Sequence, residues 1–203
     1  MSRRSKIVLE PGFFAMLCAY FYFDPAETFA PFCFSVLLHE AGHLLCLRCF
    51  GAEVHQLRLS CCGAVICTDI LPYGQELAAA ASGPAVNLAL FFLCMRGHPL
   101  TALVNLCLFT YNMLPIYPLD GGRMLRAVLH LLLHDDTAAA AERWVVRSFL
   151  AMLGGAALYC VCILHLGLWP VVVFGLLLIK IAGAVLPGES FSRFSVDKSR
   201  PVC

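Results

Sequence analysis

The sequence predicts an all-α membrane protein with about six transmembrane helices and a small β-hairpin-like surface segment after the second helix. Of its 203 residues, 61% are hydrophobic and only 13% are charged, whereas a soluble domain carries about 25% charged residues. The hydrophobic residues also gather in runs near the roughly 20 residues that a helix needs to cross a bilayer. The formal net charge of +1 excludes the broad basic field that is typical of nucleic-acid-binding proteins.

Apolar runs alternate with short polar connections along the chain. The first run follows a basic N-terminus and has no small-residue cleavage site, so we interpret it as a retained span, although Glu10 and Pro11 make it a marginal one. The predicted spans are residues 7–23, 29–47, 77–95, 100–119, 149–168 and 169–186. We assign residues 1–186 to one membrane domain, with its core at 30–125, and residues 187–203 to a short cytoplasmic tail.

Three connections have recognisable patterns. Residues 51–69 contain alternating and β-branched side chains, which predict a short hairpin at the membrane surface. Residues 124–133 are amphipathic and predict a surface helix, and residues 135–147 are predicted to be a polar connection. With six spans and an inside N-terminus, the cationic side chains lie on the cytoplasmic side, with Arg96 as the exception. This bias predicts a multi-pass cell-membrane protein with both termini, and the polar motifs described next, toward the cytoplasm.

The second predicted span contains the sequence HEAGH. On a helix, His39 and His43 share one face, so both imidazoles can reach one metal ion. Glu40 can then hold a metal-bound water as a general base, and Gly42 leaves room for a neighbouring helix or a substrate backbone. An ionisable group in mid-membrane costs at least about 2.5–3.5 kcal/mol, and a metal ion is a partner that satisfies all three polar side chains.

A catalytic zinc ion needs a third protein ligand and an open position for water. Asp120 is the best candidate, because it closes the fourth predicted span in the segment NMLPIYPLDGGR. Pro115 and Pro118 interrupt the helix there, and Gly121 and Gly122 allow a tight fold. Irregular backbone at membrane depth is tolerated only where it is buried or lines a wet cavity.

Other interpretations of these side chains are weaker. Asp120 could instead cap the amphipathic helix that follows it, and Glu53 and Glu76 are alternative third ligands in the predicted surface segments. His130 and His134 are also four residues apart, but no glutamate lies between them. We therefore expect that pair to lie at the interface or to pair with the aspartates that follow, and not to form a second metal site.

The three motifs HEAGH, SGPAVN and NMLPIYPLDGG together resemble the site-2 protease family of intramembrane zinc metalloproteases. They occur in the order that is typical of that family. The resemblance implies that His39, His43 and Asp120 bind one zinc ion per chain and that Glu40 is the base. It also implies that Asn112 lies beside the site, where it could bind a substrate strand or the developing oxyanion. The positions expected to shape the cavity are Gly42, Gly83, Pro84, Asn87, Pro115, Pro118, Gly121 and Gly122.

The family cleaves membrane-embedded or membrane-associated proteins, often to release a transcription regulator. A small chain with a short hairpin and no PDZ insertion is similar to the branch that includes the sporulation protease acting on a pro-sigma factor. We expect no CBS domain, so that the resemblance does not carry nucleotide-dependent regulation over to this chain. The expected partners are the lipid bilayer, a membrane-associated protein substrate, and a regulatory membrane partner or second copy of the chain. An extended substrate segment could pair with the hairpin at 51–69.

Two alternatives from other classes stay open at this point. A membrane metal-ion transporter would also place histidines and carboxylates in its spans, although here these residues cluster at one depth and do not form a path. A catalytically silent relative would only bind membrane partners. Replacing Glu40 by Gln separates these alternatives, because it removes the base without removing a metal ligand.

Overall fold

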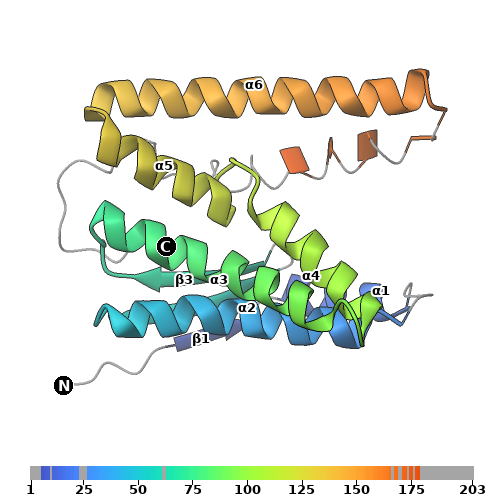
Figure 1. Cartoon of the computed structure of the whole chain (residues 1–203), viewed down its shortest axis with the longest axis horizontal. Helices are drawn as coiled ribbons and strands as arrows, with labels where there is room; N and C mark the ends of the chain where they lie inside the picture. Colours follow the sequence, from blue (N-terminus) through green and yellow to red (C-terminus); the bar gives the residue numbers. More distant parts are fainter. Residues whose placement is uncertain are drawn as a thin grey trace. The chain divides into compact units, whose positions relative to one another are not determined.

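The computed structural model describes residues 6–9, 11–22, 27–60, 63–165, 167–168, 171–172, 174–175 and 177–178. In chain order its elements are β1 (Lys6–Leu9), α1 (Pro11–Tyr22), α2 (Phe29–Cys49), β2 (Val54–Ser60), β3 (Gly63–Thr68), α3 (Tyr73–Cys94), α4 (Pro99–Asn112), α5 (Asp120–Leu132) and α6 (Asp135–Cys162) (Figure 1). The chain divides into two compact units, with the boundary between Met113 and Leu114.

In the first unit, α2, α3 and α4 pack against one another (Figure 1). The buried residues of α2 recur every fourth position, as a helix face requires: they are Ser35, His39, His43 and Leu47. Gly42 brings α2 and α3 close together, because a Cβ there would lie 2.9 Å from Val86 Cγ2 and 3.1 Å from the Ser82 carbonyl oxygen. The face of α2 that packs inward is therefore polar at its centre.

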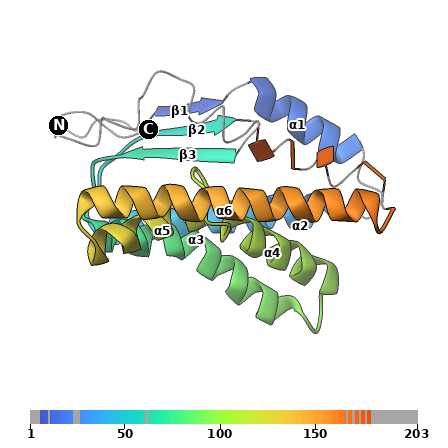
Figure 2. The same ribbon diagram turned by 90° about the horizontal axis from the view of Figure 1, so that it is seen from above.

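The first unit also contains a three-stranded sheet in the order β1-β2-β3 (Figure 2). The antiparallel pair β2–β3 is the hairpin that the alternation at 51–69 predicts, with Leu57 opposite Ile66. The parallel partner β1, with Lys6 opposite Gln56, was not predicted. Because a parallel pair joins segments far apart in the chain, its partner leaves no mark in the local pattern.

The predicted first span is wrong in its N-terminal part, since β1 occupies Lys6–Leu9 and the helix begins only at Pro11. Proline favours the first position of a helix and disfavours helical backbone in the residue before it. The 12 residues of α1 extend about 18 Å at 1.5 Å per residue, less than the roughly 30 Å hydrocarbon core.

The second unit contains α5 and α6, which pack against each other (Figure 1). Helix α5 covers the predicted amphipathic stretch but begins earlier, at Asp120. The polar connection predicted at 135–147 is wrong, because α6 runs without interruption from Asp135 to Cys162. Asp135 and Asp136 in its first turn suit the positive end of the helix dipole, and the alanines that follow are the strongest helix formers.

Within the described residues, α2, α3 and α6 are long and apolar enough to cross a membrane. They correspond to three of the predicted spans. Helix α4 has 14 residues and ends at Asn112, so that it is shorter than the span predicted at 100–119. The span predicted at 169–186 lies largely outside the described residues, as does the tail at 187–203. The membrane-protein class is therefore supported, and the count of six stays a prediction.

Most described cysteines are free thiols, as expected for small apolar side chains within helices. The free ones are Cys18, Cys33, Cys46, Cys49, Cys94, Cys107, Cys160 and Cys162. Cys67 on β3 is the exception, since it is disulfide-bonded and buried. Cys61 and Cys62 lie outside the described residues.

Candidate metal centre

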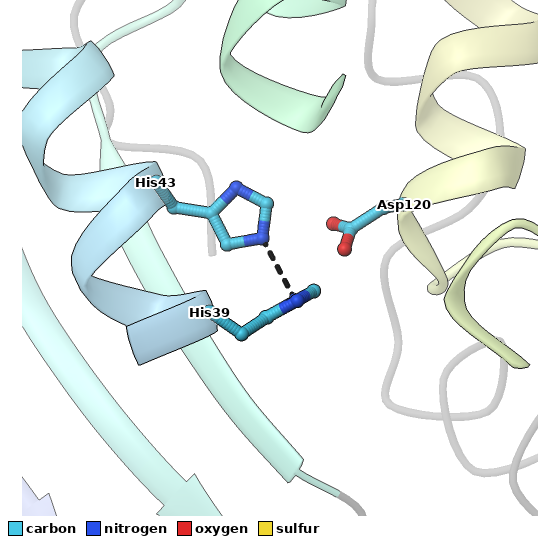
Figure 3. Close-up of side chains that lie close together, drawn as sticks. All are labelled: His39, His43 and Asp120. Atoms are coloured by element: carbon cyan, nitrogen blue, oxygen red, sulfur yellow. Dashed lines mark hydrogen bonds between the residues drawn. The ribbon is translucent and has the colours of Figure 1, made fainter. Parts of the chain in front are cut away.

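His39 and His43 face each other on the buried side of α2, with their Nε2 atoms 3.1 Å apart (Figure 3). Each Nδ1 atom lies 2.7 Å from an oxygen of α3: His39 Nδ1 donates to Asn87 Oδ1, and His43 Nδ1 donates to the Ala79 carbonyl oxygen. A carbonyl oxygen accepts but cannot donate. Each Nδ1 therefore carries the proton, and in the neutral imidazole each Nε2 keeps its lone pair.

These two nitrogens fit a bound cation. Two lone pairs cannot form a hydrogen bond with each other, yet the two Nε2 atoms are held 3.1 Å apart. Zinc binds histidine nitrogen at about 2.0–2.1 Å in tetrahedral geometry, which places two ligand nitrogens about 3.3 Å apart. Histidine ligands of metals almost always donate their other N–H to a carboxylate, a carbonyl or water. Both imidazoles satisfy this second requirement through α3.

Gly83 allows α3 to pass directly over the two imidazoles. A Cβ at this position would lie 2.6 Å from His43 Cε1 and 2.7 Å from His39 Cε1, and would be closer still to His43 Nε2. These separations are well below the 3.5–4.0 Å optimum between carbon atoms. Gly83 is therefore packed against the histidines, and the next residue, Pro84, is buried as well. One turn further on, the side-chain oxygen of Asn87 accepts the hydrogen bond from His39 Nδ1.

In the second unit, Asp120 is the first residue of α5 and its side chain is almost fully buried. Arg123 Nη1 lies 3.4 Å from Asp120 Oδ1, one turn along the same helix. The N-cap of α5 is Leu119, without a side-chain cap, so Asp120 does not take the capping position that we considered for it.

The segment before Asp120 turns tightly. The Tyr117–Pro118 peptide bond is cis, and the Leu119 N–H donates to the Ile116 carbonyl oxygen over 2.9 Å. A Cβ at Gly122 would collide with the backbone of Ile116 and Tyr117. Glycine at this position is therefore what allows the start of α5 to pack on the turn that precedes it.

Three residues are candidate metal ligands: His39 and His43 of the first unit and Asp120 of the second. Each offers one ligand atom, and all three residues are buried. Two imidazole nitrogens and a carboxylate oxygen match the donor set of catalytic zinc sites. Buried candidate ligands of this kind, in a chain with membrane-length helices, are typical of a membrane metalloprotein.

The remaining residues that the sequence singled out lie outside the set of candidate metal ligands. Glu40 is half-buried, beside a ligand on α2, and Asn112 is half-buried at the end of α4. The alternative ligands Glu53 and Glu76 do not belong to the metal-ligand group. His130 Nδ1 lies 2.9 Å from Asp135 Oδ1, which is the pairing expected for that histidine.

Sequence reasoning missed two features near the histidines. One is the Ala79 carbonyl oxygen, which no sequence pattern can reveal because it belongs to the backbone. The other is the buried pair Ser35 and Asn105, whose side chains are hydrogen-bonded. Asn105 is a polar side chain in an apolar helix, seven residues before Asn112, and such residues commonly hydrogen-bond between membrane helices.

Comparisons with known proteins agree with this site. The model of peptidase family M50 matches residues 95–155. A zinc metalloprotease of Methanocaldococcus jannaschii is 34% identical over 108 residues, which are 47% of this chain and 32% of that protein. A Synechocystis protein provisionally named a zinc metalloprotease is 33% identical over 111 residues, which are 47% of this chain and 29% of that protein. The chain thus covers about a third of the length of these relatives.

The fold is also found in a solved structure. The site-2 protease from Methanocaldococcus jannaschii matches with a TM-score of 0.61 and 22% identity, over 87% of this chain and 89% of that one. The chain therefore resembles peptidase family M50 over part of its length and shares the fold of a solved site-2 protease. The two relatives are named zinc metalloproteases, and the imidazole and carboxylate groups of the candidate ligands suit a zinc cofactor.

Proposed function

We propose that this protein is a zinc-dependent intramembrane endopeptidase that hydrolyses a peptide bond in or near the transmembrane segment of a membrane-associated protein. One observation carries the proposal. The Nε2 lone pairs of the buried His39 and His43 are directed toward each other, while the Nδ1 proton of each imidazole is hydrogen-bonded to an oxygen of α3. A hydrogen-bonded core pair would not present two lone pairs to each other. The printed names of the relatives, zinc metalloproteases, support the same reaction class.

In this proposal His39, His43 and Asp120 hold the zinc ion. Bound there, zinc would polarise the scissile carbonyl and lower the pKa of a bound water to about 7. Glu40 adjoins a ligand and takes the proton of the attacking water, then passes it to the leaving amine. Asn112 offers its side-chain N–H to the developing oxyanion or to a substrate strand.

The sheet of the first unit gives the substrate a place to bind in extended form. Because β2 is paired on both sides, the edges of the described sheet are β1 and β3. An edge strand presents unpaired backbone groups and can accept an added strand. We assign the substrate to β3, since it belongs to the predicted surface hairpin at 51–69. Proline substitutions in β3 that leave cleavage unchanged would rule this out.

The finer biological role follows from the motif resemblance and the charge distribution. We propose a multi-pass cell-membrane protein with cytoplasmic termini and with its active site toward the cytoplasm. The reaction is regulated proteolysis that releases a transcription factor or a pro-sigma factor. A regulatory membrane partner or a second copy of the chain would control access to the site.

The test compares wild type, Glu40→Gln and Asp120→Ala in two measurements: zinc per purified chain and cleavage of a membrane-anchored reporter. We expect about one zinc in wild type, retained in Glu40→Gln and lost in Asp120→Ala. Only wild type should cleave. Absence of zinc from folded, metal-supplied wild type would refute the proposal.

The same variants address the two alternatives. A metal-ion transporter would move zinc across vesicles equally well with Glu or Gln at position 40. A silent relative would bind zinc in both forms and cleave with neither. Cleavage that depends on Glu40 excludes both alternatives.

A further inference from the structure

A second polar contact lies on the same face of α2, one turn before His39. Ser35 is fully buried there, and its Oγ accepts a hydrogen bond of 2.8 Å from Asn105 Nδ2 on α4. Asn105 Nδ2 also donates to the Thr101 carbonyl oxygen over 2.9 Å. A backbone carbonyl only accepts, so the amide nitrogen of Asn105 must point this way. Its Oδ1 points elsewhere and has no hydrogen-bond partner, although the residue is fully buried.

Asn87 on α3 has an unpartnered donor where Asn105 has an unpartnered acceptor. Its Oδ1 accepts from His39 Nδ1 over 2.7 Å, while its buried Nδ2 has no partner. One orphaned donor and one orphaned acceptor therefore lie in the same unit, on fully buried side chains. Buried polar atoms are normally satisfied by protein or by ordered water, because leaving them unpaired is costly.

The two orphaned atoms belong to side chains that are hydrogen-bonded to neighbouring residues of α2. Ser35 and His39 are four residues apart on α2, so their side chains are neighbours about one turn, or 5.4 Å, apart. Asn105 is bonded to the first and Asn87 to the second. One water can join a donor and an acceptor about 5.6 Å apart through two hydrogen bonds of about 2.8 Å. A water that accepts from Asn87 Nδ2 and donates to Asn105 Oδ1 would satisfy both atoms.

We propose that a buried water links Asn105 to Asn87, and that Ser35 and Asn105 are thereby positioning residues for the metal ligand His39. The link holds Asn87 with its nitrogen toward the water and its oxygen toward His39 Nδ1. This orientation keeps the proton on Nδ1 and the lone pair of Nε2 directed at the metal, as second-sphere partners do elsewhere. The inference rests on the proposed function, since it assumes that His39 binds zinc.

The experiment measures Zn²⁺ affinity by chelator competition, and the Co²⁺ absorption spectrum, on the full chain in detergent. The variant is Asn105→Leu, and its matched control is Thr110→Val on the same helix, where an exposed Thr110 Oγ1 donates to the Leu106 carbonyl oxygen over 2.8 Å. We expect Asn105→Leu to weaken zinc binding about 10-fold or more and to shift the Co²⁺ bands. Ser35→Ala should act in the same direction but less, and Thr110→Val should not.

A double variant separates positioning from general structural damage. If Asn105 acts through Asn87, then Asn87→Leu with Asn105→Leu should bind zinc no more weakly than Asn87→Leu alone, since coupled residues are not additive. Additive losses would overturn the proposal. So would wild-type affinity and an unchanged Co²⁺ spectrum in folded Asn105→Leu.

Failure of the underlying function is distinguishable, because wild type itself would then bind no zinc. If the variants do not fold, the wild-type protein still decides the question. An experimental structure at about 2 Å that shows no water between Asn87 and Asn105 would overturn the proposal.

Discussion

Replacing Gly83 by alanine should disable the metal site. Helix α3 crosses the two histidines at this residue, and an added Cβ would lie 2.6 Å from His43 Cε1 and 2.7 Å from His39 Cε1. Relief of these contacts to the 3.5–4.0 Å optimum requires a shift of about 1 Å. Metal–ligand distances hold to within about 0.2 Å. A shift of that size therefore detaches at least one imidazole, or forces α2 and α3 apart.

The helices have little freedom to separate, because Gly42 makes a second close contact with Val86 and Ser82. We therefore expect Gly83→Ala to weaken zinc binding at least about 100-fold, the upper end of second-sphere effects. Overpacking should also lower the free energy of unfolding by about 1–3 kcal/mol. Both quantities are measured on detergent-purified protein, by chelator competition and by thermal unfolding of the zinc-free form.

Gly74→Ala is the matched control, since Gly74 begins the same helix and a Cβ there meets nothing within 4 Å. It should bind zinc as wild type does and should be stabilised by up to about 1 kcal/mol, because alanine is the better helix former. If Gly83→Ala bound zinc as tightly as Gly74→Ala, the close packing of α3 on the histidines would be wrong.

Three further predictions concern the site and its support. Asn87→Asp should keep zinc affinity near that of wild type, because a carboxylate still accepts the hydrogen bond from His39. Asn87→Leu should bind zinc about 10–100-fold more weakly. Equal losses of affinity in the two variants would argue against the acceptor role. Gly122→Ala should lower the free energy of unfolding by about 1–3 kcal/mol, because its Cβ meets the backbone of Ile116. Gly155→Ala on α6 is the control and should not lower it, since a Cβ there meets nothing within 4 Å. Equal melting temperatures of the two variants would count against the tight turn. Zinc removal by a chelator should lower the melting temperature, since free zinc at 1,000 times Kd stabilises by about 4 kcal/mol; an unchanged midpoint would mean that the folded form binds no zinc.

The histidine pair and the aspartate motif were predictable because each depends on short-range geometry. Two residues four apart share a helix face whatever the rest of the chain does, so HEAGH implies two converging imidazoles. The hairpin at 51–69 was predictable for the same reason, since alternation is a local property of a strand. The resemblance carried by the three motifs then indicated Asp120 as the third ligand.

Strand β1 and the true start of α6 were not predictable in this way. The pairing of Lys6 with Gln56 joins residues fifty positions apart. A short strand with three apolar residues after its lysine resembles the start of a helical span. Residues 135–147 looked like a loop because they carry charge, yet acidic residues at the first turn and alanines after it form a stable helix. Charge content alone suggested a loop here, whereas the positions of the charged residues within the first turn favour a helix.

By itself, the sequence determined the membrane class, the identity of the candidate ligands and the candidate base, because these depend on residue type and local spacing. Only the tertiary structure decided how the imidazoles are protonated and oriented. The protonation and orientation of the imidazoles depend on their hydrogen bonds to Asn87 and to the Ala79 carbonyl oxygen on α3. They also depend on the absence of a side chain at Gly83, which lets α3 approach the histidines. Hydrogen bonds between helices distant in the chain, and the steric space that permits them, exist only once the helices have packed.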